Sequence, residues 1–173
     1  IDMASFASGF YLADRAYVVP PGNSQKFIAR LKEICSIEKV DAVVSVVDEE
    51  LPHLRQLEEM GIAVLQPSPS FVDLCLDKLI CMRELRSRGL NAPSTWMVED
   101  VPRDAVFPLF LKPRVGRGSR GCRKVNSVKD IQDFVASSGY SPDNLLVQTL
   151  LKGEEFTVSV IVGRDGEVQG VIP

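Results

Sequence analysis

Short apolar runs alternate with amphipathic segments over the first 65 residues of the chain. In residues 24–36, apolar side chains recur at the spacing of one helix face. Residues 40–47 form a nearly continuous β-branched run, which is typical of a strand covered on both faces. After the acids at 48–50, a second helix is expected to run to about Met60, where Gly61 ends it, and a short strand follows over 62–65. This alternation predicts an α/β layer with a parallel sheet.

The pattern changes in the second half of the chain. One long helix is expected over 70–89, followed by an extended connector. Residues 106–111 predict a strand and 122–125 a returning strand, with a glycine-rich segment between them. Further expected elements are a helix capped by Ser127, strands over 145–150 and 155–162, and a hairpin turn at Asp165 and Gly166.

Composition narrows the function classes. The chain has 173 residues and a net charge of −3, so its overall charge gives no case for nucleic-acid binding. No apolar run approaches the roughly 18 residues that a membrane helix needs. Four widely spaced cysteines, without a CxxC pair, and the single His53 argue against a zinc site and favour reduced thiols in the cytoplasm.

The strongest chemical signal is a lysine followed by a glycine-rich loop. Lys112 directly follows the strand expected over 106–111. The loop after it contains Ser119 and three glycines, which are Gly116, Gly118 and Gly121. Glycines let backbone N–H groups approach an anion, and a lysine adds a point charge. The segment therefore predicts polyphosphate binding.

The loop is not a Walker A motif, because its lysine precedes the glycines. It does match a bare GxGxxG pattern, which leaves a dinucleotide-binding oxidoreductase fragment as an alternative. The strand expected after the loop argues against that alternative, since a dinucleotide fingerprint opens a helix. Arg114, Arg117 and Arg120 are expected to form a solvated loop face. The acids at 48–50 are expected to lie at a helix N-terminus, where the helix dipole stabilises negative charge, and not to bind a ligand.

The ordered set of motifs resembles the ATP-grasp superfamily, in particular the carbamoyl-phosphate synthase large chain. Lys112 and the glycine loop resemble that family's lysine and flexible loop. Asp77 and Lys78 are similar to the Asp-Lys pair before its lid, and residues 147–151 are similar to its hinge strand. Residues 10–75 resemble the α/β domain that precedes the ATP-grasp domain, so the resemblance covers nearly the whole chain.

The resemblance implies a role for each matching residue. Lys112 and Lys78 would contact phosphates, and the glycine loop with Ser119 would cover the β- and γ-phosphates. Glu155 would accept hydrogen bonds from the ribose hydroxyls. The implied cofactor-binding residues are Lys78, Lys112, Gly116, Gly118, Ser119, Gly121, Gln148, Thr149, Leu150 and Glu155. Many relatives have glutamate where this chain has Gln148, whose amide can still accept one bond from the adenine amine.

The resemblance also implies a domain plan. A Rossmann-like parallel-sheet domain is expected over 1–75, with its first strand missing, and a linking helix and connector over 76–104. The lid subdomain is expected over 105–147, and a truncated second ATP-grasp subdomain over 148–173. The implied fold class is therefore α/β, with an incomplete α+β ATP-grasp domain after the parallel sheet.

The implied activity is ATP-dependent ligation of a small carboxylate to an amine or ammonia through an acyl-phosphate, with ATP and Mg²⁺ as cofactors. The metal ligands are expected beyond Pro173, so we expect no catalysis from these residues alone. A non-catalytic nucleotide-binding or interaction module stays open as an alternative. The expected location is the cytoplasm, with neither nucleic acid nor membrane as a partner, and a homodimer is among the assemblies left open.

Overall fold

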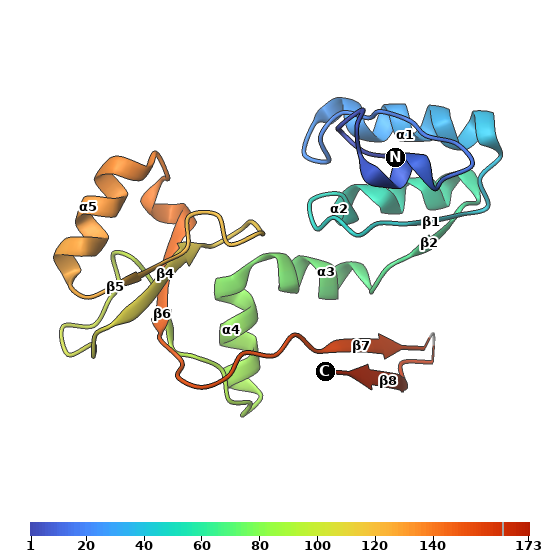
Figure 1. Ribbon diagram of the computed structural model, residues 1–173. Helices are drawn as coiled ribbons and strands as arrows, with labels where there is room; N and C mark the ends of the chain where they lie inside the picture. The colour runs from blue at the N-terminus through green and yellow to red at the C-terminus, as the bar shows by residue number, and fades with distance from the viewer. Residues whose placement is uncertain (164) are drawn as a thin grey trace.

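The computed structural model describes residues 1–163 and 165–173. The N-terminal part of the chain is a small α/β unit (Figure 1). Its elements are η1 (Ser8–Tyr11), α1 (Gln25–Glu38), β1 (Ala42–Val44), α2 (Leu51–Leu54), η2 (Arg55–Met60) and β2 (Ala63–Leu65). Strands β1 and β2 pair in parallel and are connected through α2 and η2, which confirms the predicted parallel sheet.

Capping and burial explain why α1 forms where the sequence predicts it. The Ser24 side chain accepts a hydrogen bond from the Lys26 amide at the start, and Lys39 adopts the left-handed conformation at the end. The face toward the sheet carries the buried Phe27 and Leu31, which pack in one cluster with Leu54 of α2. This cluster gives the N-terminal unit a hydrophobic core of its own.

The single helix expected over 70–89 is wrong, because the chain forms two helices there. These are α3 (Pro69–Leu76) and α4 (Lys78–Ser87), and they enclose Asp77. Asp77 leaves the helical region with φ −98° and ψ 101°, and its carboxylate accepts hydrogen bonds from the amides of Leu79 and Ile80. The side chain thus caps α4 at the place where the apolar pattern predicts an uninterrupted helix.

A four-stranded antiparallel sheet follows the helices (Figure 1). Its strands are β3 (Thr95–Met97), β4 (Leu109–Pro113), β5 (Arg123–Val125) and β6 (Leu145–Thr149), in the order β3-β6-β4-β5. Helix α5 (Val128–Ser138) and the short η3 (Pro142–Asn144) connect β5 to β6. The strands predicted on either side of the glycine loop are confirmed as β4 and β5, which pair antiparallel. Strand β3 is an element that the sequence pattern did not predict.

The two faces of this sheet have different characters. Leu109, Leu111 and Val147 are buried against α5 in a second hydrophobic cluster. Side chains alternate between the faces along a strand, so Phe110 and Lys112 of β4 point the opposite way. Their register partners on β6 are Gln148 and Leu146. One face of the sheet therefore builds the core, and the other is available for a site.

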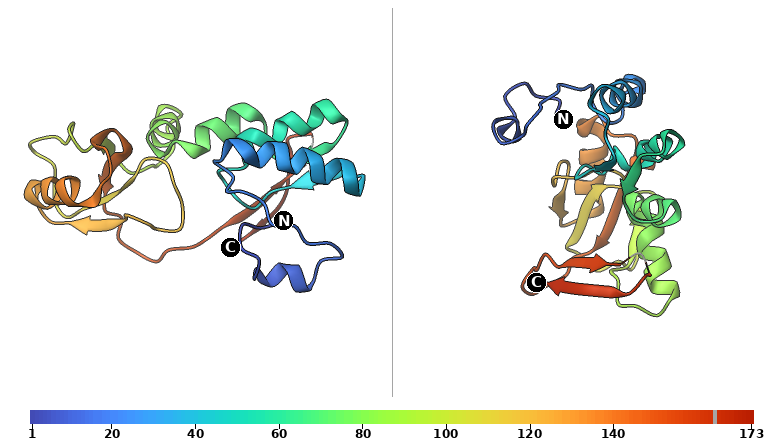
Figure 2. Two further views of the ribbon diagram at one scale, coloured as in Figure 1. Left: turned by 90° about the horizontal axis from the view of Figure 1, so that it is seen from above. Right: turned by 90° about the vertical axis from the view of Figure 1, so that its right-hand side faces the viewer.

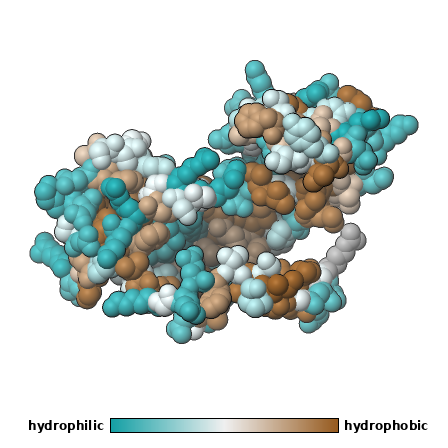
Figure 3. Space-filling view, viewed as in Figure 1, coloured by the Kyte–Doolittle hydropathy of each residue, from teal (hydrophilic) through white to brown (hydrophobic). Residues whose placement is uncertain are grey.

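The chain continues into a two-stranded antiparallel hairpin, β7 (Ser159–Val162) and β8 (Val168–Ile172). Asp165 accepts a hydrogen bond from the Glu167 amide at the turn, which confirms the predicted hairpin. The first strand is shorter than expected, because residues 155–158 are not in a strand. Figure 2 shows the hairpin lying apart from the four-stranded sheet, and Figure 3 shows apolar side chains gathered over it. Its valines and isoleucines are exposed.

Candidate nucleotide-binding site

A cavity of about 620 Å³ lies between the glycine loop, the non-core face of β4 and β6, and the segment that follows β6. Nine of the ten predicted cofactor-binding residues line it, and Gly121 is the exception. The nine are Lys78, Lys112, Gly116, Gly118, Ser119, Gln148, Thr149, Leu150 and Glu155. Residues from four separate stretches of the sequence are thus brought to one site.

Lys112 projects into the cavity from β4. Burial lowers the pKa of Lys112 below its ordinary value, and the nearby positive charge of Lys78 lowers it further. Among the residues that the structure describes, no carboxylate forms a salt bridge with Lys112. Two lysines near each other without such a partner create a positive region that favours an anionic ligand.

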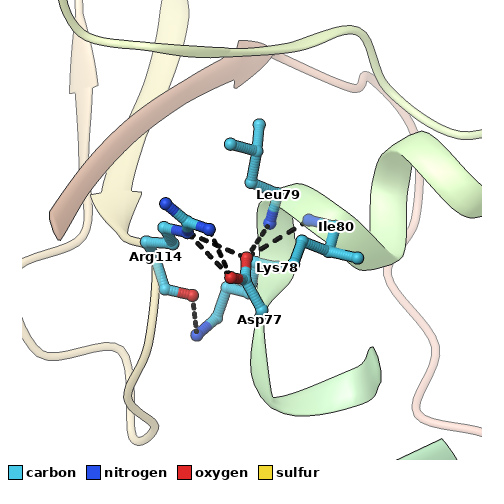
Figure 4. Close-up of polar contacts among 5 residues, drawn as sticks. All are labelled: Asp77, Lys78, Leu79, Ile80 and Arg114. Atoms are coloured by element: carbon cyan, nitrogen blue, oxygen red, sulfur yellow. Dashed lines mark hydrogen bonds and ion pairs between the residues drawn. The ribbon is translucent and has the colours of Figure 1, made fainter. Parts of the chain in front are cut away.

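The end of β4 is fixed to the start of α4 by Arg114 and Asp77 (Figure 4). Arg114 Nη2 lies 2.6 Å from Asp77 Oδ2, and Nε donates to the same carboxylate at 2.8 Å and 3.0 Å. The Lys78 amide donates to the Arg114 carbonyl oxygen at 3.2 Å. Burial acts to raise the pKa of Asp77, but Arg114 and the Ile80 and Leu79 amides outweigh it and hold the pKa below its ordinary value.

Lys78 contacts the backbone of the glycine loop. Its Nζ donates to the carbonyl oxygen of Gly116 at 2.6 Å and to that of Arg114 at 3.4 Å. The family resemblance implies a phosphate contact for this lysine, whereas the structure places its ammonium group on the base of the loop. Because Lys78 also lines the cavity, one side chain joins α4, the loop and the candidate site.

The glycine loop needs its glycines for conformational reasons. Gly118 has φ +67° and Gly121 has φ +71°, in the region that L-residues rarely adopt. A Cβ at Gly121 would lie 3.0 Å from Pro113 Cγ and from the Tyr140 ring, whereas one at Gly118 would meet open space. Gly121 therefore allows the loop to close against the sheet, while Gly118 shapes its tip. Ser119, at the tip, also has a positive φ of +55°.

Gln148 is the one polar residue buried in the described part of the chain, at 4% exposure. Its Nε2 donates to Thr95 Oγ1 at 2.8 Å, so β3 orients the amide on β6. Among the hydrogen bonds of the described residues, the Oε1 atom takes part in none, which leaves it able to accept from a ligand. Thr149 and Leu150 follow along the cavity wall, with Leu151 beside them.

Glu155 lies at the far side of the cavity with Glu154, and both are exposed. Their carboxylates can accept hydrogen bonds from ligand hydroxyl groups. The described residues contain no group of three or more His, Cys, Asp or Glu side chains that could hold a metal ion.

The structure also places residues that sequence reasoning missed or assigned otherwise. Arg114 is fixed by Asp77, and Arg117 pairs with Glu49, so neither is simply part of a solvated loop face. Glu49 accordingly has a partner other than a helix N-terminus. Phe110 has no motif of its own, but its alternation with the buried Leu109 and Leu111 along β4 is a signal that could have found it. Thr95 lies on β3, whose three residues are too few to show such an alternation.

Comparisons with known proteins match both parts of the chain. Residues 1–65 match the family model of the PylC-like, N-terminal domain. Residues 75–169, which are 95 of the 173 residues, match that of the ATP-grasp domain. Pyruvate carboxylase of Bacillus subtilis is 25% identical over 91% of this chain, and D-alanine–D-alanine ligase A of Bacillus cereus is 27% identical over 62%. The chain spans only 16% and 38% of those two relatives.

Solved structures show the same fold. L-amino acid ligase from Bacillus licheniformis superposes with a TM-score of 0.71 over 91% of this chain and 39% of its own, at 16% identity. N5-carboxyaminoimidazole ribonucleotide synthetase from Thermus thermophilus gives a TM-score of 0.70 over 99% of this chain and 45% of its own, at 19% identity. The arrangement of helices and sheets is thus common to all three proteins.

Proposed function

This chain belongs to the ATP-grasp superfamily, and from that premise we propose that it is the ATP-binding portion of an ATP-dependent ligase. The observation that carries the proposal is the convergence of Lys78, Lys112 and the glycine loop on one cavity of about 620 Å³. That volume is in the range of small-molecule and cofactor sites. The alternative, a non-catalytic module, would also bind ATP in this cavity but would not catalyse a reaction.

ATP would lie with its phosphates toward the lysines and the glycine loop. Ammonium groups and loop amides together offset the charge of a polyphosphate. Its base would lie along β6, where Gln148 Oε1 and the backbone beyond it can accept and donate hydrogen bonds. Phe110 and Leu150 supply apolar surface there, and Glu155 stands where a ribose hydroxyl could donate to it.

The reaction we propose is the one implied by the family resemblance. A small carboxylate attacks the γ-phosphorus of ATP and releases ADP, and an amine or ammonia then displaces phosphate from the acyl-phosphate. We place the chain nearest the carbamoyl-phosphate synthase group because of the order of its motifs. Relatives of this chain include a pyruvate carboxylase and a D-alanine–D-alanine ligase, which is compatible with this class of chemistry.

Magnesium is the second cofactor that the family implies. The described residues contain no group of three or more His, Cys, Asp or Glu side chains that could hold a metal ion, and we assign no step to the metal within these residues. The domain plan of 1–75, 76–104, 105–147 and 148–173 also remains part of this proposal, and so does a cytoplasmic location. In the described part of the chain, no helix is long and apolar enough to cross a membrane.

Trapping the acyl-phosphate tests the proposal. The full-length protein would be incubated with ATP, Mg²⁺, hydroxylamine and a panel of small carboxylates, because hydroxylamine converts an acyl-phosphate to a stable hydroxamate. We expect hydroxamate and ADP in equal amounts with the correct acid. ATP binding without hydroxamate or ADP for every acid would favour the non-catalytic module. An absence of ATP binding would reject the proposal as a whole.

A further inference from the structure

The tip of the glycine loop contacts the N-terminal unit through one ion pair. Arg117 Nε donates to Glu49 Oε2 at 2.7 Å, between residues 68 positions apart in the sequence. Arg117 lies in the loop between β4 and β5, and Glu49 lies in the loop after β1 (Figure 1). This contact joins the two parts of the molecule at the edge of the candidate nucleotide site.

Further charges surround the ion pair. The Arg117 hydrogen bond lowers the pKa of Glu49 below its ordinary value, and Arg120 contributes in the same direction. Glu49 in turn raises the pKa of Arg117, and the negative charges of Asp48 and Glu50 raise it further. The loop tip therefore meets an acidic run with two guanidinium groups, so the attraction between the two parts exceeds that of a single isolated pair.

Arg117 also lines the cavity, together with Arg120. A guanidinium group recognises carboxylate and phosphate through the same planar arrangement of N–H donors. Among the described contacts, Glu49 engages the Nε donor of Arg117, so a phosphate that draws the guanidinium group toward the cavity would weaken this ion pair. The carboxylate of Glu49 therefore competes with a bound polyphosphate for the positive charge of Arg117.

We propose that Arg117 is a phosphate-binding residue of the nucleotide site and that Glu49 is its internal competitor, which holds the glycine loop until a polyphosphate displaces it. This inference rests on the proposed function, since it assumes that the cavity binds ATP. It assigns to Glu49 a role in the nucleotide-free state, although Glu49 itself does not line the cavity.

The size of the effect follows from the exposure of the pair. The side chains of Arg117 and Glu49 are 52% and 36% exposed, so solvent weakens their attraction. Competition of this strength would reduce the apparent affinity for ATP by about two- to fivefold. The reduction should diminish as salt rises, because added ions screen exposed charges.

Three variants of the full-length protein separate the two roles. Glu49→Gln removes the competitor, Arg117→Gln removes the proposed phosphate contact, and the exchange Glu49→Arg with Arg117→Glu restores the pair with reversed charges. Asp48→Asn is the matched control, because it removes a neighbouring acid that has no salt bridge in the described residues. Hydrogen exchange of residues 115–121 without nucleotide reports the loop contact, and calorimetry with ATP reports affinity.

We expect Glu49→Gln to speed amide exchange in the loop and to tighten ATP binding about two- to fivefold. Arg117→Gln should speed exchange equally but weaken ATP binding. The charge-reversed pair should regain slow exchange and still bind ATP weakly, and Asp48→Asn should have the smallest effect on both. Unchanged exchange in Glu49→Gln would overturn the loop contact, and faster exchange with unchanged affinity would overturn the competition.

The same measurements distinguish failure of this inference from failure of the proposed function. If the wild type binds ATP and Arg117→Gln binds it equally well, the phosphate role of Arg117 is wrong while the nucleotide site stands. If the wild type and all variants fail to bind ATP, the nucleotide site and the competition are both rejected. The exchange data would then still report whether Glu49 holds the loop.

Discussion

The ammonium group of Lys78 lies 2.6 Å from the carbonyl oxygen of Gly116, at the point where β4 passes into the glycine loop. Lys78 opens α4, so the base of the loop is fixed to a helix. We expect Lys78→Met to speed hydrogen exchange over residues 114–118 and to weaken ATP binding about tenfold, because a hydrogen bond to a charged donor is lost. Lys124→Met, at an exposed lysine of β5, should change neither quantity.

We expect the buried charge of Lys112 to lower the free energy of unfolding while it contributes to ATP binding. Its pKa is lowered by burial, so the unfolded state binds more protons than the folded state between the folded pKa and about 10.4. Stability therefore rises with pH through that interval, and the full cost is present at neutral pH. Lys112→Met should raise the free energy of unfolding at pH 7, because the variant no longer buries a charged group. Urea titrations at pH 7 and pH 10 would show the gain becoming smaller.

ATP binding should respond to pH in the opposite sense. A bound polyphosphate favours the charged form of Lys112, so affinity should fall as pH rises through the pKa of the ligand-free protein. The Lys112→Met variant should bind ATP weakly and without this alkaline loss. A variant that keeps wild-type affinity would remove Lys112 from the site. Lys124→Met again serves as the control.

Asp77 should govern stability in acid. Its folded-state pKa is lowered, so its stabilising contribution is complete above its unfolded pKa of about 3.9 and is lost as pH falls through the folded value. Asp77→Asn should destabilise the protein by about 1–3 kcal/mol at pH 7, because Arg114 loses a charged partner, while the amide oxygen of asparagine can still cap α4. The difference from wild type should shrink below pH 4, as thermal unfolding at several pH values would record.

An exposed ion pair provides the comparison for Asp77. Asp133 pairs with Lys129 on α5, where their side chains are 64% and 77% exposed. Asp133→Asn should change stability by less than about 0.5 kcal/mol at any pH. An equal loss in both variants would mean that the contact between Asp77 and Arg114 has no special weight.

Two glycines of the loop should differ in their tolerance of a methyl group. Gly121→Ala adds strain at a positive φ and a contact at 3.0 Å with Pro113 and Tyr140, so we expect a loss of about 2–3 kcal/mol. Gly118→Ala carries only the backbone strain and should cost about 1 kcal/mol. Denaturant midpoints would rank the two, and the reverse order would contradict the packing of the loop against the sheet.

The buried amide of Gln148 depends on Thr95. Thr95→Val removes the acceptor of its Nε2 donor, which should destabilise the protein by about 1–3 kcal/mol and weaken ATP binding because the amide is no longer held in place. Thr157→Val, at an exposed threonine before β7, should be neutral. Thermal unfolding and calorimetry would measure the two effects. Unchanged ATP affinity in Thr95→Val would separate Gln148 from base recognition.

Local rules account for much of the fold that was predicted. Helix α1, the parallel pair β1–β2, and the strand–loop–strand around the glycines follow from periodicity, capping and turn residues within short windows. Asp77 escapes such rules because the apolar pattern continues through it, and its partner Arg114 lies 37 positions away. Strand β3 escapes them too, because three residues give too short an alternation and its pairing with β6 is long-range.

The candidate site likewise has a part that local sequence predicts and a part that depends on long-range contacts. The lysines and glycines could be recognised from residue type and order, and nine of the predicted residues line one cavity. The contacts that position these residues could not be recognised from the sequence. Glu49 and Arg117 belong to different parts of the chain, and neither flanking sequence indicates the other. Long-range pairs of this kind require coordinates.

The two-faced sheet of β4 and β6 has a consequence for sequence divergence. Leu109, Leu111 and Val147 on one face belong to the hydrophobic core, whereas Phe110, Lys112 and Gln148 on the other face line the candidate site. Neighbouring codons are therefore subject to separate selection. A lineage could replace every second residue to accept a new substrate without disturbing its core. Proteins can then keep one architecture at 16–19% identity, as this chain and the two superposed structures do.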